Sequence, residues 1–273
     1  MGLHMVLVGN SNSGKRTIFG ALAGQSGHVD YLEEGGESIL EGVLTSSREV
    51  RLTVLPGISA LSAYDPLEHQ VRKYLLRQAP QTIINIVDAV NLEQSLYLTL
   101  ELISLGLPML VALNRTDLLE AKKREVDVPL LKKELGIGVV NTAANERRGM
   151  HELALGAISI GRAGQGPKGR MFLSPEVERD VQQIYKLACQ EEKFGRWMAL
   201  QLFQRDEEVW KYMNLSDELA GQVEEIIVRR EEERRTDSIG IVAYDRYASI
   251  ERLYEACVVD ILPRKRGFGR WWI

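Results

Sequence analysis

The stretch GNSNSGKRT, which runs from Gly9 to Thr17, has the spacing of a phosphate-binding loop. In the pattern G-x-x-x-x-G-K-[ST], backbone N–H groups of a glycine-rich turn surround phosphate oxygens, and the lysine neutralises their charge. The loop lies between the apolar run HMVLV and the helical pattern TIFGALAG, which weakens the alternative of a chance Gly-Lys in an ordinary turn. We expect phosphate contacts from Asn10, Asn12, Ser13, Gly14, Lys15, Arg16 and Thr17.

A second motif, NRTD, follows the apolar run PMLVAL. A carboxylate at Asp117 can accept hydrogen bonds from N1–H and the 2-amino group of guanine, and adenine does not present these two donors together. Alone, N-x-x-D often marks a turn or a helix cap. At the carboxyl end of a parallel strand, where open sheets bind ligands, it predicts recognition of GTP and GDP by Asn114, Arg115 and Asp117.

Two further segments match G-protein loops less closely. Leu55, Pro56 and Gly57 stand where small G proteins carry Asp-x-x-Gly, the loop that senses the terminal phosphate, and Val54 takes the place of the acid. The segment Thr142, Ala143 and Ala144 follows the apolar run IGVVN, and its small side chains would let backbone approach the base. We expect both segments at the nucleotide.

The first part of the chain alternates apolar runs with amphipathic helical patterns, which indicates an α/β fold with a mostly parallel sheet. These motifs come at the ends of strands expected over 4–8, 50–55, 82–88, 108–114 and 137–141, with helices over 67–76 and 92–106. We therefore expect a P-loop G domain over residues 1–160.

The pattern changes near residue 160. The glycine-rich stretch GRAGQGPKGR breaks regular structure, and we expect a linker over 161–172. Ser174, Pro175 and Glu176 have the types of an N-cap and a first helical turn, and two more helical patterns cover 216–235 and about 238–258. The prediction is a small all-α domain over 173–262, followed by a basic and aromatic tail over 263–273.

Composition excludes several classes of function. The net charge of −4, with no basic stripe along the body of the chain, argues against a nucleic-acid partner. Cys189 and Cys257 are too few for a disulfide framework or a metal site and suggest a reducing compartment. The chain shows no signal peptide and no run of about 18 apolar residues, and its four histidines are not paired at the spacing of an Fe2+ site.

The segment GNSNSGK, residues 84–118 and YDRYASIERL resemble the cytosolic N-terminal region of the ferrous iron transport protein B (FeoB) family. The resemblance implies a GTP-binding G domain and a helical domain, leading into a membrane region that conducts Fe2+ at the inner (cell) membrane. The tail, with Arg264, Lys265, Arg266 and two tryptophans, is typical of a cytoplasmic membrane interface, although a disordered basic tail remains an alternative. The soluble fragment would lie on the cytoplasmic face, and whether it forms a homo-oligomer is open.

Three positions that hold Mg2+ in such G domains are changed here. The hydroxyl after the lysine is Arg16, the acid is Val54, and alignment puts Gly36 at the switch threonine. Valine cannot ligate a hard cation and arginine repels one, so we predict weak or absent Mg2+ dependence. Arg16 would then lie near the β-phosphate. The rival is that Arg16 points to solvent and Thr17 supplies a hydroxyl one residue late.

Loss of the metal would weaken GTP hydrolysis, because the transferred phosphoryl group loses its main charge stabiliser. Asn12 occupies the position that helps to hold K+ in FeoB-like G proteins, and K+ would compensate in part. Neither Ser59 nor His69 is a convincing water-positioning residue, so no catalytic residue is assigned. The alternative function is a nucleotide-independent scaffold with a pseudo-GTPase fold; an ATPase or small-molecule kinase is disfavoured by NRTD.

Overall fold

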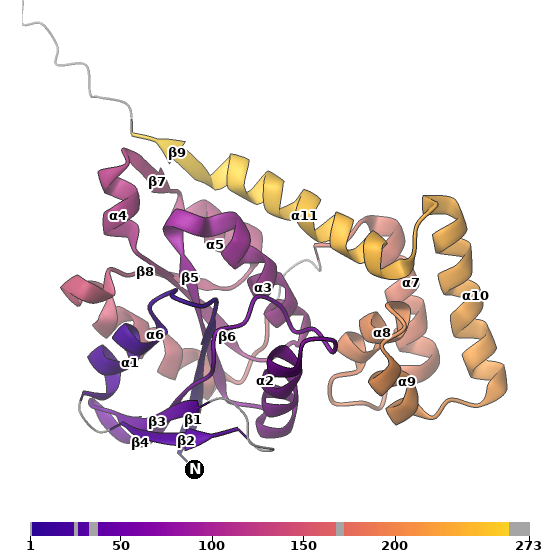
Figure 1. The fold of residues 1–273 in the computed structure, drawn as a ribbon, viewed down its shortest axis with the longest axis horizontal. Coiled ribbons are helices and arrows are strands. Elements are labelled where there is room, and N and C mark those ends of the chain that lie inside the picture. The colour runs from indigo at the N-terminus through magenta and orange to yellow at the C-terminus, as the bar shows by residue number, and fades with distance from the viewer. Residues whose placement is uncertain (1, 25–26, 33–37, 168–171, 262–273) are drawn as a thin grey trace, which may run out of the picture.

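The computed structural model describes residues 2–24, 27–32, 38–167 and 172–261, and its first half is built on a seven-stranded sheet (Figure 1). The strand order is β2-β3-β4-β1-β5-β6-β8. Strands β4, β1, β5, β6 and β8 are parallel, whereas β2 and β3 form an antiparallel extension at one edge. The bounds are β1 Leu3–Gly9, β2 His28–Tyr31, β3 Ser38–Leu44, β4 Ser47–Val54, β5 Thr82–Asp88, β6 Met109–Asn114 and β8 Gly138–Asn141.

The five parallel strands are those expected from the sequence, because β1, β5 and β6 are almost wholly buried and therefore read as continuous apolar runs. The antiparallel edge was not predicted. All four residues of β2 are exposed, and β3 mixes buried and partly exposed positions around Gly42, so neither has the pattern of a buried strand.

Helices cover both faces of the sheet. On one face, α1 (Lys15–Ala23) and α6 (Met150–Ala163) share a core with Leu7, Leu52 and Ile84. On the other face lie α2 (Pro66–Gln78), α3 (Leu92–Ser104) and α5 (Val128–Leu135). The short α4 (Thr116–Ala121) follows β6 at the carboxyl edge of the sheet. This arrangement confirms the predicted α/β class.

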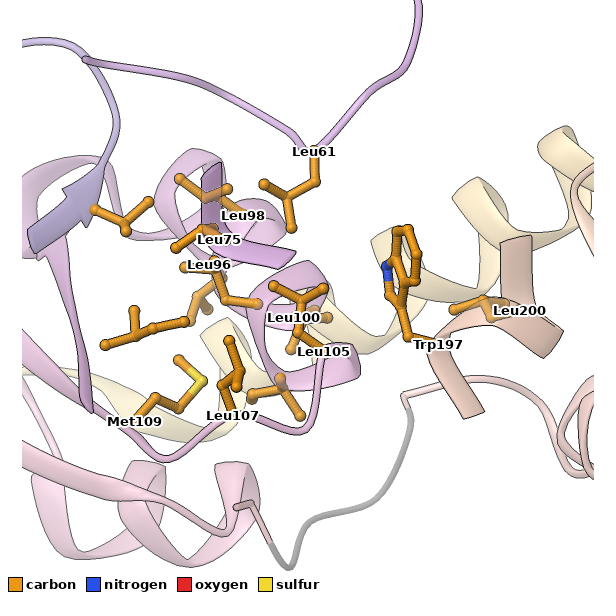
Figure 2. Close-up of a cluster of buried hydrophobic side chains, with 14 of the residues drawn as sticks. Leu61, Leu75, Leu96, Leu98, Leu100, Leu105, Leu107, Met109, Trp197 and Leu200 are labelled. Atoms are coloured by element: carbon orange, nitrogen blue, oxygen red, sulfur yellow. The ribbon is translucent and has the colours of Figure 1, made fainter. Parts of the chain in front are cut away.

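The second half is helical. It contains α7 (Pro175–Ile184), a π-helical turn (Tyr185–Cys189), α8 (Gly195–Phe203), α9 (Glu207–Met213), α10 (Asp217–Arg234) and α11 (Ser238–Cys257). Its core is continuous with that of α3, since Trp197 and Leu200 of α8 belong to the same buried cluster as Leu100 and Leu105 (Figure 2). No helix in the described ranges is long and apolar enough to span a membrane.

The last helix returns to the sheet domain. α11 runs from the helical half across α3 and α5 (Figure 1), and strand β9 (Val258–Asp260) continues it directly. β9 pairs antiparallel with β7 (Arg124–Val126). Sequence periodicity found the helix, but each of these strands is only three residues long, too short to show alternation.

Charged side chains also join the two halves. Arg72 of α2 is 2% exposed and donates two hydrogen bonds to Asp206, at 2.6 and 3.0 Å, while its guanidinium lies 5.0 Å from the Trp197 ring centroid. Arg246 of α11 donates to Glu101 of α3 at 2.6 Å, and the other oxygen of Glu101 accepts from the Leu61 backbone. Arg72 therefore holds α2 against the helical half, and Glu101 links the Leu61 backbone to α11.

Candidate nucleotide-binding site

The loop between β1 and α1 has the backbone of a phosphate-binding turn. Gly14 has φ 98° and Asn12 has φ 61°, both in the left-handed region. A Cβ at Gly14 would lie 2.3 Å from Asn114 Nδ2, so glycine is needed there both for its conformation and for the close approach of Asn114. The loop and α1 leave their N–H groups at the carboxyl end of β1, where an anion would be bound.

Lys15 is buried at the start of α1, and its own loop satisfies its ammonium. Nζ donates to the carbonyl of Gly9 at 2.8 Å and to that of Asn10 at 2.7 Å. Burial, followed by the charge of Arg16, lowers the pKa of Lys15 from 10.5 to about 8. The amine is therefore held in place beneath the loop, with its charge sensitive to the neighbouring guanidinium.

A cavity of about 550 Å³ opens above this loop. Among the described residues, its wall carries three cations, Lys15, Arg16 and Arg115, and no carboxylate. Arg16 and Thr17 both line it and both are exposed, so the two alternatives for the residue that faces a β-phosphate stay open. The lining consists of Ser11, Asn12 and residues 14–17 from the loop and α1, residues 54–57 after β4, and Ser38, Leu67 and Arg115.

Asn114 ties the NRTD motif to two other loops. Its Nδ2 donates to the Ser13 carbonyl at 3.0 Å. Its Oδ1 accepts from the Ala144 backbone N–H at 3.1 Å and from the Thr142 hydroxyl at 3.3 Å. The predicted segment 142–144 is thus brought against Asn114 and does not itself line the cavity. Asn114 therefore joins the phosphate loop and the segment 142–144 through hydrogen bonds.

Asp117 lies in the first turn of α4, partly exposed, and within the described ranges its carboxylate has no hydrogen-bond or ion-pair partner. Arg115, directly before that helix, has φ 63° and donates to Asp88 Oδ2 at 2.8 Å and to the Asn12 carbonyl at 2.5 Å. The sequence reasoning missed Asp88. The sequence feature that could have indicated Asp88 is its place as the last residue of the strand expected over 82–88. That strand lies beside the strand that ends in Asn114.

The chemistry of the loop fits an anionic ligand. Within the described ranges, both polar atoms of the Asn10 side chain and the Ser13 hydroxyl are buried without a hydrogen-bond partner. Buried polar groups are normally paired, so this loop has unused hydrogen-bonding capacity next to the cavity, although neither residue lines the cavity itself. The loop Leu55–Gly57 closes on the same place, since a Cβ at Gly57 would lie 2.5 Å from Ser11 Oγ.

The described residues of the lining do not fit Mg2+. A hard divalent cation in a protein is held by carboxylates and other oxygen ligands, and among the described residues the lining has hydroxyls at Thr17 and Ser38 but no carboxylate. Val54 lines the cavity at 5% exposure. Ser38, at the start of β3, is a hydroxyl residue that the sequence reasoning missed; Gly36, the predicted switch position, lies outside the described residues, as does the tail 263–273.

Two sequence candidates for positioning water lie away from the cavity. His69 Nε2 lies 2.6 Å from Glu208 Oε2, across the junction with the helical half. The Ser59 backbone N–H donates to Glu68 at 3.0 Å. Neither residue lines the cavity, and no catalytic residue is assigned.

Comparison with known proteins agrees with this geometry. The family described as "Ferrous iron transport protein B" matches residues 3–156, and the "FeoB cytosolic helical domain" matches residues 174–259. A Salmonella typhimurium Fe(2+) transporter FeoB is 34% identical over 207 residues, which are 73% of this chain and 27% of that protein. A Porphyromonas gingivalis fusion of Fe(2+) transport protein A with FeoB is 33% identical over 221 residues, 77% of this chain and 26% of the relative. The chain spans about a quarter of the length of these relatives.

Solved structures show the same architecture. An S. thermophilus NFeoB mutant bound to GDP superposes with a TM-score of 0.89 at 30% identity, covering 94% of this chain and 100% of that one. Another mutant of that protein, bound to GMPPNP, has a TM-score of 0.83 at 31% identity and covers 93% of this chain and 99% of that one. The chain therefore belongs to the ferrous iron transport protein B (FeoB) family, as a G domain followed by the FeoB cytosolic helical domain.

Proposed function

We propose that this chain is the guanine-nucleotide-binding regulatory part of an Fe2+ transporter. The observation that carries the proposal is the cavity above the phosphate loop, whose wall, as far as the structure describes it, holds three cations and no carboxylate. Such a wall suits the phosphates of a nucleotide. The relatives are named Fe(2+) transporters, and solved neighbours hold GDP and GMPPNP. The partner would be a membrane-embedded transport region, with this part at the cytoplasmic face of the inner membrane.

Guanine selectivity rests on Asp117. Its carboxylate is partly exposed and unpaired within the described ranges, three residues after Asn114, which is hydrogen-bonded to the phosphate loop. A guanine base presents two donors to it, whereas adenine leaves the acid unsatisfied. The base would lie along the segment Thr142–Ala144, whose small side chains let the backbone approach.

Nucleotide binding in this chain is proposed to need no Mg2+. Lys15, Arg16 and Arg115 supply fixed positive charge at the cavity, and Val54 and Arg16 stand at positions where the metal would need oxygen ligands. Without that metal, hydrolysis of GTP is proposed to be several orders of magnitude weaker than in G domains that keep it. Asn12, exposed at the cavity wall, is the residue proposed for a K+ ion that compensates in part.

Calorimetric titration of the protein with GDP, GTP and ATP, each with Mg2+ and with EDTA, tests these statements. We expect GDP and GTP to bind with similar affinity in both buffers. We expect ATP to bind at least about a hundredfold more weakly than either. Repeating the GTP titration and a phosphate-release assay in K+ and in Na+ tests Asn12. Binding that strictly requires Mg2+ would contradict the proposed role of Arg16.

Two sets of variants sharpen the experiment. Asp117→Asn should change the preferred base from guanine to xanthine. Xanthine carries a carbonyl at C2 in place of the amino group of guanine, and the asparagine amide can donate a hydrogen bond to that carbonyl. The double variant Arg16→Thr with Val54→Asp restores a hydroxyl and an acid and should make nucleotide binding respond to Mg2+. Each single variant is the matched control. A double variant that stays indifferent to Mg2+ would show that the lost ligands are not the reason.

The second candidate is a nucleotide-independent scaffold. Two features of the phosphate loop favour it. The Lys15 ammonium already donates to the carbonyls of Gly9 and Asn10, and Gly57 packs against Ser11. In that case none of the three nucleotides would bind at millimolar concentration, and the helical half would make the partner contacts. The same titration decides between the two functions.

A further inference from the structure

The strand that follows the last helix is bound to the segment that follows the guanine-reading motif. β9 (Val258–Asp260) pairs with β7 (Arg124–Val126), and the pairing is extended at both ends. The Asp127 N–H donates to the Cys257 carbonyl at 2.7 Å, and the Ile261 N–H donates to the Lys123 carbonyl at 2.8 Å. The end of the described chain is therefore hydrogen-bonded to the G domain, at the end of α11 that is remote from α7 and α10 (Figure 1).

Side chains strengthen this attachment. The Arg124 guanidinium lies 5.6 Å from the ring centroid of Tyr254 on α11 and 3.3 Å from Asp260 on β9. Cys257, the last residue of α11, is fully buried. β7 thus contacts α11 through Tyr254 and β9 through Asp260, and Asp127, the residue after β7, is hydrogen-bonded to the end of α11.

The path from Asp117 to β7 is short and contains no free loop. α4 spans Thr116–Ala121, and the turn after it is closed by the N–H groups of Lys122 and Lys123, which donate to Leu119 and Glu120 at 2.9 Å each. β7 begins at the next residue, Arg124. α4 and β7 are therefore joined by a hydrogen-bonded turn of two residues, Lys122 and Lys123.

A pair of three-residue strands is marginal by itself, so β7 and β9 are expected to open locally more often than the central sheet. The other end of the path carries Asp117, which is unpaired within the described ranges. A base bound there would restrain the first turn of α4 and, through it, β7. Binding would thus reduce the opening of the strand pair.

We propose that guanine-nucleotide occupancy is conveyed to the strand that leaves α11 through α4 and the β7–β9 pair. This route does not pass through α2 or the interface with α8 and α9. The inference rests on the proposed guanine binding at Asp117. Because coupling between two sites is reciprocal, the strand pair must also stabilise the bound nucleotide by the same factor.

Hydrogen–deuterium exchange of the full chain, without ligand and with saturating GDP, tests the route, and ATP serves as the ligand control. We expect peptides covering 123–127 and 257–261 to exchange about fivefold more slowly with GDP, near the lower end of typical couplings, and to be unchanged with ATP. Unchanged exchange while calorimetry shows GDP bound would overturn the route and leave the proposed function standing. Absence of GDP binding would overturn both.

A variant pair tests reciprocity. Val259 is the central residue of β9, opposite Glu125, and it is 41% exposed. Val259→Pro removes the N–H at that position, whereas Val259→Thr keeps the β-branched shape and the backbone donor. We expect the proline variant to bind GDP about fivefold more weakly and the threonine variant to bind as the parent does. Equal affinity in both variants would overturn the inference, and the exchange experiment on the unmodified chain decides it even if the proline variant does not fold.

Discussion

The Arg115 guanidinium lies 2.8 Å from the carboxylate of Asp88 and donates a second hydrogen bond to the carbonyl of Asn12. One side chain therefore links the end of β5, the start of α4 and the phosphate loop. Asp88 is 5% exposed and also accepts from the Val90 N–H and the Asn91 amide, so the anchor itself is fixed. Arg115 therefore fixes the position of the phosphate loop relative to the start of α4.

Arg115→Met should speed the release of GDP. The change removes two hydrogen bonds made by a charged group and one positive charge at the cavity. A hydrogen bond to a charged group contributes about 1.5–3 kcal/mol, so GDP release should be at least about tenfold faster. Stopped-flow displacement of a fluorescent GDP analogue measures the rate. Arg162→Met, an exposed position in the last turn of α6, is the matched control. Equal release from both variants would show that the link does not retain the nucleotide.

GDP affinity should fall as pH rises through about 8. The pKa of Lys15 is lowered to about 8, by burial first and then by the charge of Arg16. Phosphate binds the protonated amine, so above this pH the affinity should drop by about tenfold per unit. Arg16→Thr removes one cause of the lowered pKa and should move the decline to higher pH. Calorimetry between pH 7 and 10 measures both curves, and a decline at the same pH in parent and variant would contradict this account.

His4 should make the fold less stable as the pH falls below about 6.5. Burial, and then the charge of Arg51, lowers the pKa of His4 from 6.5 to about 4. Between these values the unfolded chain binds a proton that the folded chain does not, so stability rises with pH across this window. The loss on acidification is about 3 kcal/mol at most. Urea unfolding at pH 7 and pH 5 should show a smaller difference in His4→Gln than in the parent, because carboxylates elsewhere titrate equally in both.

Breaking the buried pair between Arg72 and Asp206 should destabilise the junction of the two halves. Burial alone would raise the pKa of Asp206, but the hydrogen bonds and charge of Arg72 outweigh it and hold the pKa below its usual value. Arg72→Met leaves this carboxylate buried and unpaired, which should cost about 3 kcal/mol or more in urea unfolding. Adding Asp206→Asn should recover much of that loss, since an asparagine still caps α9 at the Val209 N–H.

Lys73→Met is the control for that experiment. Lys73 lies beside Arg72 on the same helix, but its ammonium is about half exposed and 3.5 Å from Glu208. An exposed pair of this kind should contribute less than about 1 kcal/mol. Equal losses in Arg72→Met and Lys73→Met would show that burial of the Arg72 pair does not govern its contribution.

Local signals in the sequence were sufficient for much of the fold. The phosphate loop was found because a glycine-rich turn between a strand and a helix has a fixed spacing, and Gly14 does adopt the left-handed conformation that the spacing implies. The five parallel strands were found because they are buried as apolar runs. β2 and the strands β7 and β9 were not found, since exposed or three-residue strands have no such pattern.

The sequence by itself thus determined the class of fold, the five parallel strands and the motifs that follow four of them. Only the tertiary structure decided which distant groups share one site: Arg115 with Asn12, Asn114 with Ser13, and β9 with β7. The physical reason is range. Turn chemistry and periodicity are fixed by neighbours a few residues apart, whereas the partners of a side chain such as Arg72, which pairs with a residue 134 positions away, depend on how whole elements pack.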